Sequence, residues 1–253
     1  MSQSGEVKSQ VLGVIPARWG SSRFPGKPLH LIAGKELVLR VWDQCQKCHS
    51  LHDVVIATDD ERIYNRAIEY GAKAVMTDTN HPTGTDRIAE VIEQFPEHTH
   101  AINIQGDEPL ISPELIDQLA NELRQDTTLE MVTAATELTD DALVQDSNIV
   151  KVVFNQKNDA MYFSRSPIPF QRDVIDGQKF YRHLGIYGYQ SDFVQRFVKF
   201  PNSTIEQTES LEQLRALDHG ATIRIVVTDD PAIGVDTPEQ AQQIEQLIIN
   251  GNH

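Results

Sequence analysis

The first half of the chain alternates apolar, strand-like runs with segments whose apolar residues recur at helical spacing, and this alternation constrains the fold most. Strand-like runs at 11–15, 53–60, 72–76 and 100–109 alternate with helical patterns at 34–48, 61–71 and 84–95. Crossovers of this length make neighbouring strands parallel. The pattern therefore predicts an α/β fold with a Rossmann-like, doubly wound, mostly parallel mixed sheet, and ligands beyond the carboxyl ends of its strands.

The middle of the chain changes to extended segments with short polar breaks, which predicts a β-rich lobe at about 131–190. The α/β pattern then returns with one helix over 203–220, closed by Gly220, and a final helix from Thr237 onward. Because no linker or low-complexity segment separates these parts, we expect one domain over 1–253 with the lobe as an elaboration.

Composition argues against two broad classes of protein. The formal net charge is −15, whereas general nucleic-acid binding needs a broad basic surface. No stretch approaches the roughly 18 apolar residues of a membrane span, and the polar start "MSQSGEVKSQ" lacks the apolar middle of a secretory signal. We therefore expect a cytoplasmic protein that acts without nucleic acid and without membrane insertion.

Two cysteines, Cys45 and Cys48, form a C-x-x-C motif that His49 and His52 follow closely. Such a cluster invites a zinc or redox interpretation. The cysteines, however, continue the helical spacing of the apolar residues before them. We therefore expect both thiols to be core residues on one helix face.

The loop after the first apolar run, "VIPARWGSSRFPGKPL", concentrates the cations Arg18, Arg23 and Lys27 with two glycines. It is not a P-loop, because the spacing is one residue too long and Pro28 replaces the magnesium-binding Ser or Thr; the chain also lacks G-x-G-x-x-G. Glycines let a backbone approach phosphate oxygens closely, and cations neutralise them. The loop predicts polyphosphate binding, with a surface loop of incidental charge as the alternative.

Seven motifs along the chain together match the sequence pattern of a known enzyme family. They are "PARWGSSRFPGKPL", "GTDRIAEV", "NIQGDEP", "YFSRSPIP", "RHLGIYGY", "LEQLRAL" and "GVDTPE". The collinear set, which covers nearly the whole chain, resembles the CMP-sugar synthetases, in particular those acting on 3-deoxy-manno-octulosonate (Kdo). The resemblance implies a nucleotide-diphospho-sugar transferase fold. It also implies attack of the Kdo anomeric hydroxyl on the α-phosphate of CTP, giving CMP-Kdo and pyrophosphate.

The resemblance assigns residues on the nucleotide side of the site. It implies that Arg18 and Lys27 bind phosphates and act in catalysis. Arg23 and Ser21 or Ser22 are further expected donors. The full set of expected nucleotide-binding residues is Ala17, Arg18, Ser21, Ser22, Arg23, Lys27, Gly84, Thr85, Arg87 and Asp107. Thr83 stands where many relatives have Ser, and a helix start explains Thr85 equally well.

The resemblance makes Asp107 and Asp236 ligands of Mg²⁺, the expected cofactor. Magnesium takes one or two protein carboxylates and completes its octahedron with water and substrate phosphate. Thr237 begins a capping box with proline at the first helical position, which leaves Asp236 free. Asp107 has a competing turn role, and Glu108 is a second acid that chemistry alone leaves open.

On the sugar side, the resemblance implies Gln105, Arg165, His183, Tyr187, Glu212 and Gln213. Structural alternatives exist for several of them. Tyr187 could pack within a strand, Arg165 could pair with an acid, and Glu212 with Gln213 could form a solvated helix face. His183 by its spacing alone favours a structural role.

The leading hypothesis is a Mg²⁺-dependent cytidylyltransferase that activates Kdo. Alternatives are the same reaction on 8-amino-Kdo or a sialic acid, a non-catalytic CTP sensor, and a structural protein. The resemblance further implies a homodimer built through the β-rich lobe and a role in lipopolysaccharide biosynthesis.

Overall fold

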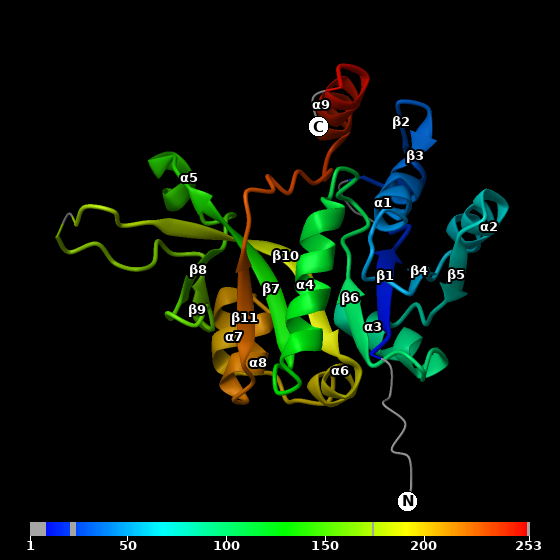
Figure 1. The fold of residues 1–253 in the computed structure, drawn as a ribbon. Coiled ribbons are helices and arrows are strands. Elements are labelled where there is room, and N and C mark those ends of the chain that lie inside the picture. Colours follow the sequence, from blue (N-terminus) through cyan, green and yellow to red (C-terminus); the bar gives the residue numbers. More distant parts are fainter. Residues whose placement is uncertain (1–8, 21–23, 174, 252–253) are drawn as a thin grey trace, which may run out of the picture.

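The computed structural model describes residues 9–20, 24–173 and 175–251. Within these residues the main sheet has nine strands, seven of which lie side by side across the molecule (Figure 1). In spatial order these are β11 (Ile223–Val227), β7 (Met131–Leu138), β10 (Phe180–Gln190), β6 (His100–Asn103), β1 (Val11–Ala17), β4 (Asp53–Thr58) and β5 (Lys73–Met76). A small separate hairpin joins β2 (Leu31–Ile32) to β3 (Lys35–Glu36).

The sheet is mixed but mostly parallel. Strand β1 is parallel to β4 and β6, β4 is parallel to β5, and β11 is parallel to β7. Strand β10 runs antiparallel to both β6 and β7 and joins the two parallel parts. The predicted doubly wound, mostly parallel mixed sheet is therefore confirmed.

Helices cover both faces of this sheet. The helices α1 (Leu37–Cys45), α2 (Glu61–Tyr70) and α4 (Pro113–Gln125) pack on one face, and α3 (Gly84–Gln94), α6 (Ser191–Phe197) and α8 (Gln213–Asp218) pack on the other. The shorter α5 (Asp141–Gln145) and α7 (Thr204–Glu209) lie towards the β11 side, and α9 (Pro238–Ile249) packs near β2 (Figure 1). Among the described helices, none is long and apolar enough to cross a membrane.

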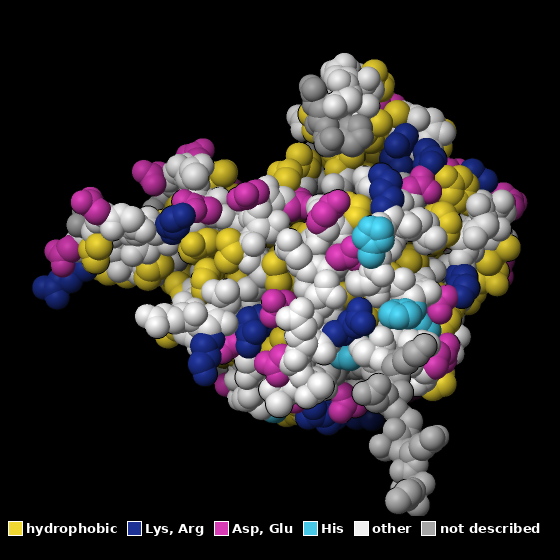
Figure 2. Space-filling view, in the orientation of Figure 1, with side chains coloured by type: hydrophobic (Ala, Val, Ile, Leu, Met, Phe, Trp, Pro, Cys, Tyr) yellow, Lys and Arg dark blue, Asp and Glu magenta, His cyan; other side chains and the backbone are white. Residues whose placement is uncertain are grey.

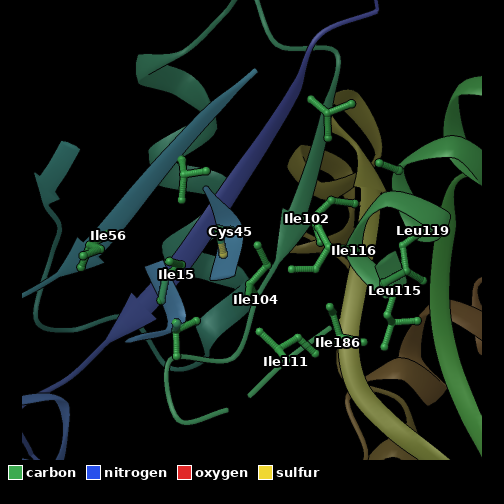
Figure 3. Close-up of a cluster of buried hydrophobic side chains, with 14 of the residues drawn as sticks. Ile15, Cys45, Ile56, Ile102, Ile104, Ile111, Leu115, Ile116, Leu119 and Ile186 are labelled. Atoms are coloured by element: carbon green, nitrogen blue, oxygen red, sulfur yellow. The ribbon is translucent and has the colours of Figure 1, made fainter. Parts of the chain in front are cut away.

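The alternation of side chains along β1 divides the core into two layers. Val11 and Ile15 point towards α1 and α4, whereas Leu12 and Val14 point towards α3. Figure 3 shows the first layer, in which Ile15 lies among apolar side chains of neighbouring strands and of α4. Because both faces of β1 are buried, the strand is held firmly, and its carboxyl end is a fixed point from which a loop can be positioned.

Two of the extended segments in 131–190, β7 and β10, are among the seven strands that lie side by side in the main sheet. The other two, β8 (Lys151–Phe154) and β9 (Ala160–Ser164), form a hairpin beside β10. An arm, described over residues 165–173 and 175–179, lies between β9 and β10 in sequence and extends away from the body at the left of Figure 1. The arm is thus attached directly to the strand that crosses the centre of the molecule.

The prediction of one helix over 203–220 is wrong, because the chain forms α7 and α8 with a break at Ser210. Ser210 has φ 52°, a left-handed conformation that ends α7. The guanidinium of Arg165 donates to the carbonyl oxygen of Glu209 at 2.8 Å and to that of Ser210 at 3.4 Å. These carbonyls would accept bonds within a continuous helix, so a contact from Arg165, the residue directly after β9, replaces helical bonding here.

Two smaller predictions can be judged from the described residues. Helix α1 begins at Leu37 rather than at residue 34, because Lys35 and Glu36 form a strand. Cys45 is buried in the core, as expected. Cys48 packs against the same core but is only partly buried and lies beyond the end of α1, so the prediction that both thiols share one helix face is wrong for Cys48. Both thiols are free. Burial raises the pKa of Cys45 well above its ordinary value and that of Cys48 to about 12, so both are unreactive near neutral pH.

Candidate active site

A cleft of about 400 Å³ lies beyond the carboxyl ends of β1 and β6. This is the position at which a parallel α/β sheet is expected to bind ligands. Six residues assigned to the site from the sequence line it together. They are Ala17, Arg18, Lys27, Gln105, Asp107 and Asp236.

Two backbone contacts bring distant parts of the chain to this cleft. A Cβ on Gly106 would lie 2.5 Å from the carbonyl oxygen of Pro16, so only glycine lets the loop after β6 lie against the end of β1. The backbone N–H of Val235 donates to the carbonyl of Asp107 at 2.9 Å. Together these contacts place the segment that leads to Asp236 beside the loop that carries Asp107.

Lys27 lies between the two expected metal ligands. Gly26 has φ 70°, and its N–H donates to the carbonyl of Trp19 at 3.2 Å, which turns the chain into the short 3-10 helix Lys27–Leu29. The Lys27 Nζ then lies 2.7 Å from Asp107 Oδ2 and 3.4 Å from Asp236 Oδ1. One cation and two carboxylates, separated by up to 209 positions in sequence, therefore meet at one point.

Arg18 connects the end of β1 to the segment before α3. Its Nη2 donates to the carbonyl oxygens of His81 at 2.9 Å and Thr83 at 3.0 Å. Burial, followed by the nearby charge of Arg87, lowers the pKa of Arg18, but an arginine remains a cation at neutral pH. Both contacts are to neutral oxygens, so its positive charge remains available to an anion in the cleft.

The start of α3 is fixed by a capping box, which the sequence analysis did not predict. The Thr83 side chain accepts the N–H of Asp86, and the Asp86 carboxylate accepts the N–H of Thr83. Arg87, one turn into α3, is fully buried and pairs with Asp59 at 2.7 Å. Its guanidinium lies in the interior rather than on the cleft wall, and direct contact of Gly84 or Arg87 with a nucleotide stays a prediction.

Several expected sugar-side residues gather where the pairing of β10 and β7 is irregular, between Leu184 and Tyr187. Gln105 Nε2 donates to the backbone carbonyl of Gly185 at 2.7 Å. His183 is buried, and its Nε2 lies 3.0 Å from the hydroxyl of Thr133. Burial and then the Arg182 charge lower the pKa of His183 to about 3. The imidazole is therefore neutral at physiological pH.

The remaining sugar-side residues differ in the contacts that they make. Arg165 donates to three backbone carbonyls, those of Ser147, Glu209 and Ser210. Its backbone N–H also donates to the Glu209 carboxylate. Among the described residues the guanidinium itself pairs with no acid, so the structure does not show the alternative in which Arg165 pairs with an acid of the β-rich lobe. Gln213 is buried, and its Nε2 has no hydrogen-bond partner among the described residues. Glu212 and Gln213 therefore do not form a solvated helix face.

The structure separates Asp107 from its neighbour Glu108. Asp107 lines the cleft with Lys27, whereas Glu108 is absent from the cleft lining that the described residues form. Burial, followed by the charges of Asp107 and Asp230, raises the pKa of Glu108 to about 7. A carboxyl that is partly protonated at neutral pH is a weak cation ligand, which favours Asp107.

Comparison with known proteins agrees with this geometry. A sequence model of the family described as Cytidylyltransferase matches residues 12–223. The chain belongs to the cytidylyltransferase family. The 3-deoxy-manno-octulosonate cytidylyltransferase of Protochlamydia amoebophila is 41% identical to it over 252 residues, which cover 98% of this chain and 97% of the relative. The enzyme of the same name from Polynucleobacter necessarius subsp. necessarius is 46% identical, covering 94% and 95%.

Solved structures also resemble this cytidylyltransferase. CMP:2-keto-3-deoxy-manno-octonic acid synthetase, complexed with CTP, has a TM-score of 0.91 and 40% sequence identity, and the match covers 96% of this chain and all of that one. A 4-diphosphocytidyl-2C-methyl-D-erythritol synthase from Anaerococcus prevotii has a TM-score of 0.63 at 18% identity, covering 94% and 96%, and shares the fold alone.

Three predicted residues of the cytidylyltransferase, Ser21, Ser22 and Arg23, lie outside the described residues. Two contributors to the site were missed. Asp59, which pairs with Arg87, could have been found because it lies at the polar carboxyl end of a predicted strand, directly after the observed end of β4. Thr133 gave no such signal, since a hydroxyl inside an apolar strand does not reveal which carbonyls it meets.

Proposed function

We propose that this chain transfers the CMP group of CTP to Kdo and releases pyrophosphate. The observation that carries the proposal is the meeting of Lys27, Asp107 and Asp236 in one cleft at the ends of β1 and β6. Relatives that match almost the whole chain are named for this reaction, and a similar solved structure holds CTP. The experiment that tests it is release of pyrophosphate by the purified protein.

The cations of the cleft suit a triphosphate. Lys27 has a compact, mobile ammonium group that can move from the carboxylates to the β- and γ-phosphates of CTP. Arg18 directly follows the end of the buried strand β1, and its guanidinium donates to the carbonyls of His81 and Thr83. The guanidinium is therefore already in place when the nucleotide arrives. Together they would bind the leaving pyrophosphate, whose negative charge grows as the bond to the α-phosphorus breaks.

The two aspartates fit Mg²⁺. Among the described residues no group of three or more His, Cys, Asp or Glu side chains could hold a metal ion, so protein groups alone would not fill an octahedron. Magnesium commonly binds one or two carboxylates and takes its other ligands from water and phosphate. Asp107 and Asp236 share one lysine and are therefore close enough to act together. Bound there, Mg²⁺ would neutralise phosphate oxygens of CTP.

The sugar acid would bind beside the irregular part of β10. Its anomeric hydroxyl oxygen attacks the α-phosphorus, the bond from that phosphorus to the bridging oxygen breaks, and the hydroxyl proton is released. We propose that Gln105, Arg165, His183, Tyr187, Glu212 and Gln213 orient the sugar for this attack. The neutral His183 ring and the unpaired Gln213 amide are groups that can exchange hydrogen bonds with sugar hydroxyls.

The test compares Kdo, 8-amino-Kdo, a sialic acid and no sugar, each with CTP and Mg²⁺. Turnover selective for Kdo is expected. Turnover with another sugar acid would show that the reaction is the proposed one but that the substrate is not Kdo. Saturable CTP binding without any pyrophosphate release would indicate that the protein is a non-catalytic nucleotide sensor.

We also propose a homodimer that works in the cytoplasm and supplies CMP-Kdo for lipopolysaccharide biosynthesis. Hydrophobic side chains gather on the arm and the hairpin beside it (Figure 2). Phe170 is 86% exposed, and Met161 and Ile175 are each 65% exposed. Such a surface favours burial against a second copy. A monomeric molar mass by light scattering at working concentration would contradict the dimer.

A further inference from the structure

Helix α3 carries a buried hydroxyl that forms a hydrogen bond to a residue far away in the sequence. Thr85, at the second position of α3, is 3% exposed. Its hydroxyl donates to Glu212 Oε2 at 2.6 Å, across 127 positions of sequence. Thr85 was assigned to the nucleotide from the sequence, yet in the structure its polar atom is directed to an expected sugar-side carboxylate.

Glu212 is held on its other side by Arg215. The Arg215 Nη2 donates to Glu212 Oε1 at 2.9 Å, and its Nε lies 3.1 Å from Glu206 Oε2. Glu206 belongs to the capping box of α7 with Ser203. The buried guanidinium therefore ties α7, the turn after it and α8 to one another. Each oxygen of Glu212 thus has one fixed hydrogen bond from the protein.

The Glu212 side chain nevertheless remains reachable from solvent, with 30% of its surface exposed. It also lies close to Tyr187 and Tyr189 of β10, since its charge helps to raise the pKa of both phenols beyond the effect of burial. A carboxylate oxygen can accept two hydrogen bonds. Glu212 therefore keeps acceptor capacity beside Tyr187, where the sugar is proposed to bind.

We propose that Thr85 is a positioning residue for the sugar acid. The Thr85 hydroxyl, together with Arg215, fixes the Glu212 carboxylate so that this carboxylate accepts hydrogen bonds from hydroxyl groups of the sugar. This inference rests on the proposed function. Arg18 binds the segment that leads into α3, and Thr85 lies in the first turn of this helix. The bond from Thr85 to Glu212 therefore also joins the nucleotide side of the cleft to the sugar side. Thr85 then acts on sugar affinity and not on affinity for CTP.

The decisive variant is Thr85→Val, which removes the hydroxyl and keeps the shape. A hydrogen bond to a charged group is worth enough to change an affinity by about tenfold or more. In steady-state assays at saturating CTP, the KM for Kdo should rise about tenfold, whereas calorimetric titration should give a Kd for CTP within twofold of the unaltered protein. Thr85→Ser restores the hydroxyl and should restore the KM for Kdo.

The matched control is Thr208→Val, which removes an exposed hydroxyl that donates within α7 to the carbonyl of Thr204. It should change neither constant. An unchanged KM for Kdo in Thr85→Val, or an equal rise in both constants, would overturn the inference. Failure of the unaltered protein to release pyrophosphate would instead refute the proposed function. Even then, a tenfold loss of CTP affinity in Thr85→Val would show that Thr85 serves the nucleotide.

A second variant tests the other side of the same carboxylate. Arg215→Lys keeps the charge but loses the two-sided contact, and it should raise the KM for Kdo with little change in kcat or in the Kd for CTP. Arg196→Lys is its control, because Arg196 pairs with Glu130 on the surface. Thermal melting separates misfolding from a local effect. A well-folded Arg215→Lys protein with an unaltered KM for Kdo would count against this role.

Discussion

Replacing Lys27 with methionine should strengthen binding of a divalent cation in the absence of nucleotide. The Nζ of Lys27 lies 2.7 Å from Asp107 and 3.4 Å from Asp236, so it occupies the space between the two carboxylates proposed to hold the metal. In the ligand-free protein, lysine and cation therefore compete for the same oxygens. Only when the phosphates of CTP attract Lys27 are both carboxylates released.

The size of the effect follows from these contacts. The Lys27 side chain is 16% exposed, but the side chain of Asp236 is 53% exposed, so water screens the second pair strongly. A partly exposed ion pair contributes on the order of 1 kcal/mol, and two pairs therefore oppose cation binding by about 1–2 kcal/mol. Since 1.4 kcal/mol is a factor of ten in an equilibrium constant, the Lys27→Met protein should bind the cation roughly tenfold more tightly.

Titration with Mn²⁺, followed by electron paramagnetic resonance or calorimetry without CTP, measures this directly. Lys35→Met is the control, because Lys35 pairs with Asp43 away from the cleft and its loss should leave Mn²⁺ affinity unchanged. The same Lys27→Met protein should keep its melting temperature and lose turnover. An equal or weaker Mn²⁺ affinity in Lys27→Met would refute the competition, and a collapsed melting temperature would show that Lys27 serves folding.

Three further outcomes are expected. Gly106→Ala should lower the unfolding free energy by about 1–3 kcal/mol and reduce turnover, because the added Cβ would overlap the carbonyl oxygen of Pro16. Denaturant melts measure the first effect and pyrophosphate assays the second, and a fully active variant would contradict the prediction. The pKa of His183 is about 3 in the folded protein but about 6.5 in the unfolded chain, because burial disfavours the imidazolium. The contribution of the neutral ring to the unfolding free energy is therefore lost as the pH falls below 6.5, by about 1.4 kcal/mol per pH unit. A His183→Gln protein should show a shallower acid decline in denaturant melts, and an identical slope would disprove this account. Thiol reagents at pH 7 should modify Cys45 and Cys48 only on unfolding, and rapid labelling of the native protein would show that burial does not protect them.

The periodicity of the sequence was enough to predict the sheet and most of the helices around it. Strand β1 and the middle of β4 are apolar without alternation because both faces are buried, and that pattern is local. The break at Ser210 could not be predicted in this way. It depends on Arg165, which is 45 positions away and donates to the carbonyls that a continuous helix would have used.

The site residues likewise fall into those that local sequence predicts and those that depend on distant contacts. Charges that follow strand ends, such as Lys27 and Asp107, were predictable because parallel strands bring their carboxyl ends to one edge. The partner of Thr85 was not predictable, since a threonine near a helix start looks like part of a cap. Its true neighbour, Glu212, follows a turn whose geometry is set by buried ion pairs rather than by local spacing.

The irregular pairing of β10 with β7 limits how the length of this chain can change. Between Leu184 and Tyr187, strand β10 advances three residues while β7 advances one, so two extra residues are accommodated. Deletion of one of these two residues would turn every following side chain of β10 to the opposite face of the sheet. Deletion of both would keep each side chain on its face but remove the Gly185 carbonyl that Gln105 binds. Insertions and deletions should therefore accumulate in the arm, and the number of residues in β10 should stay fixed.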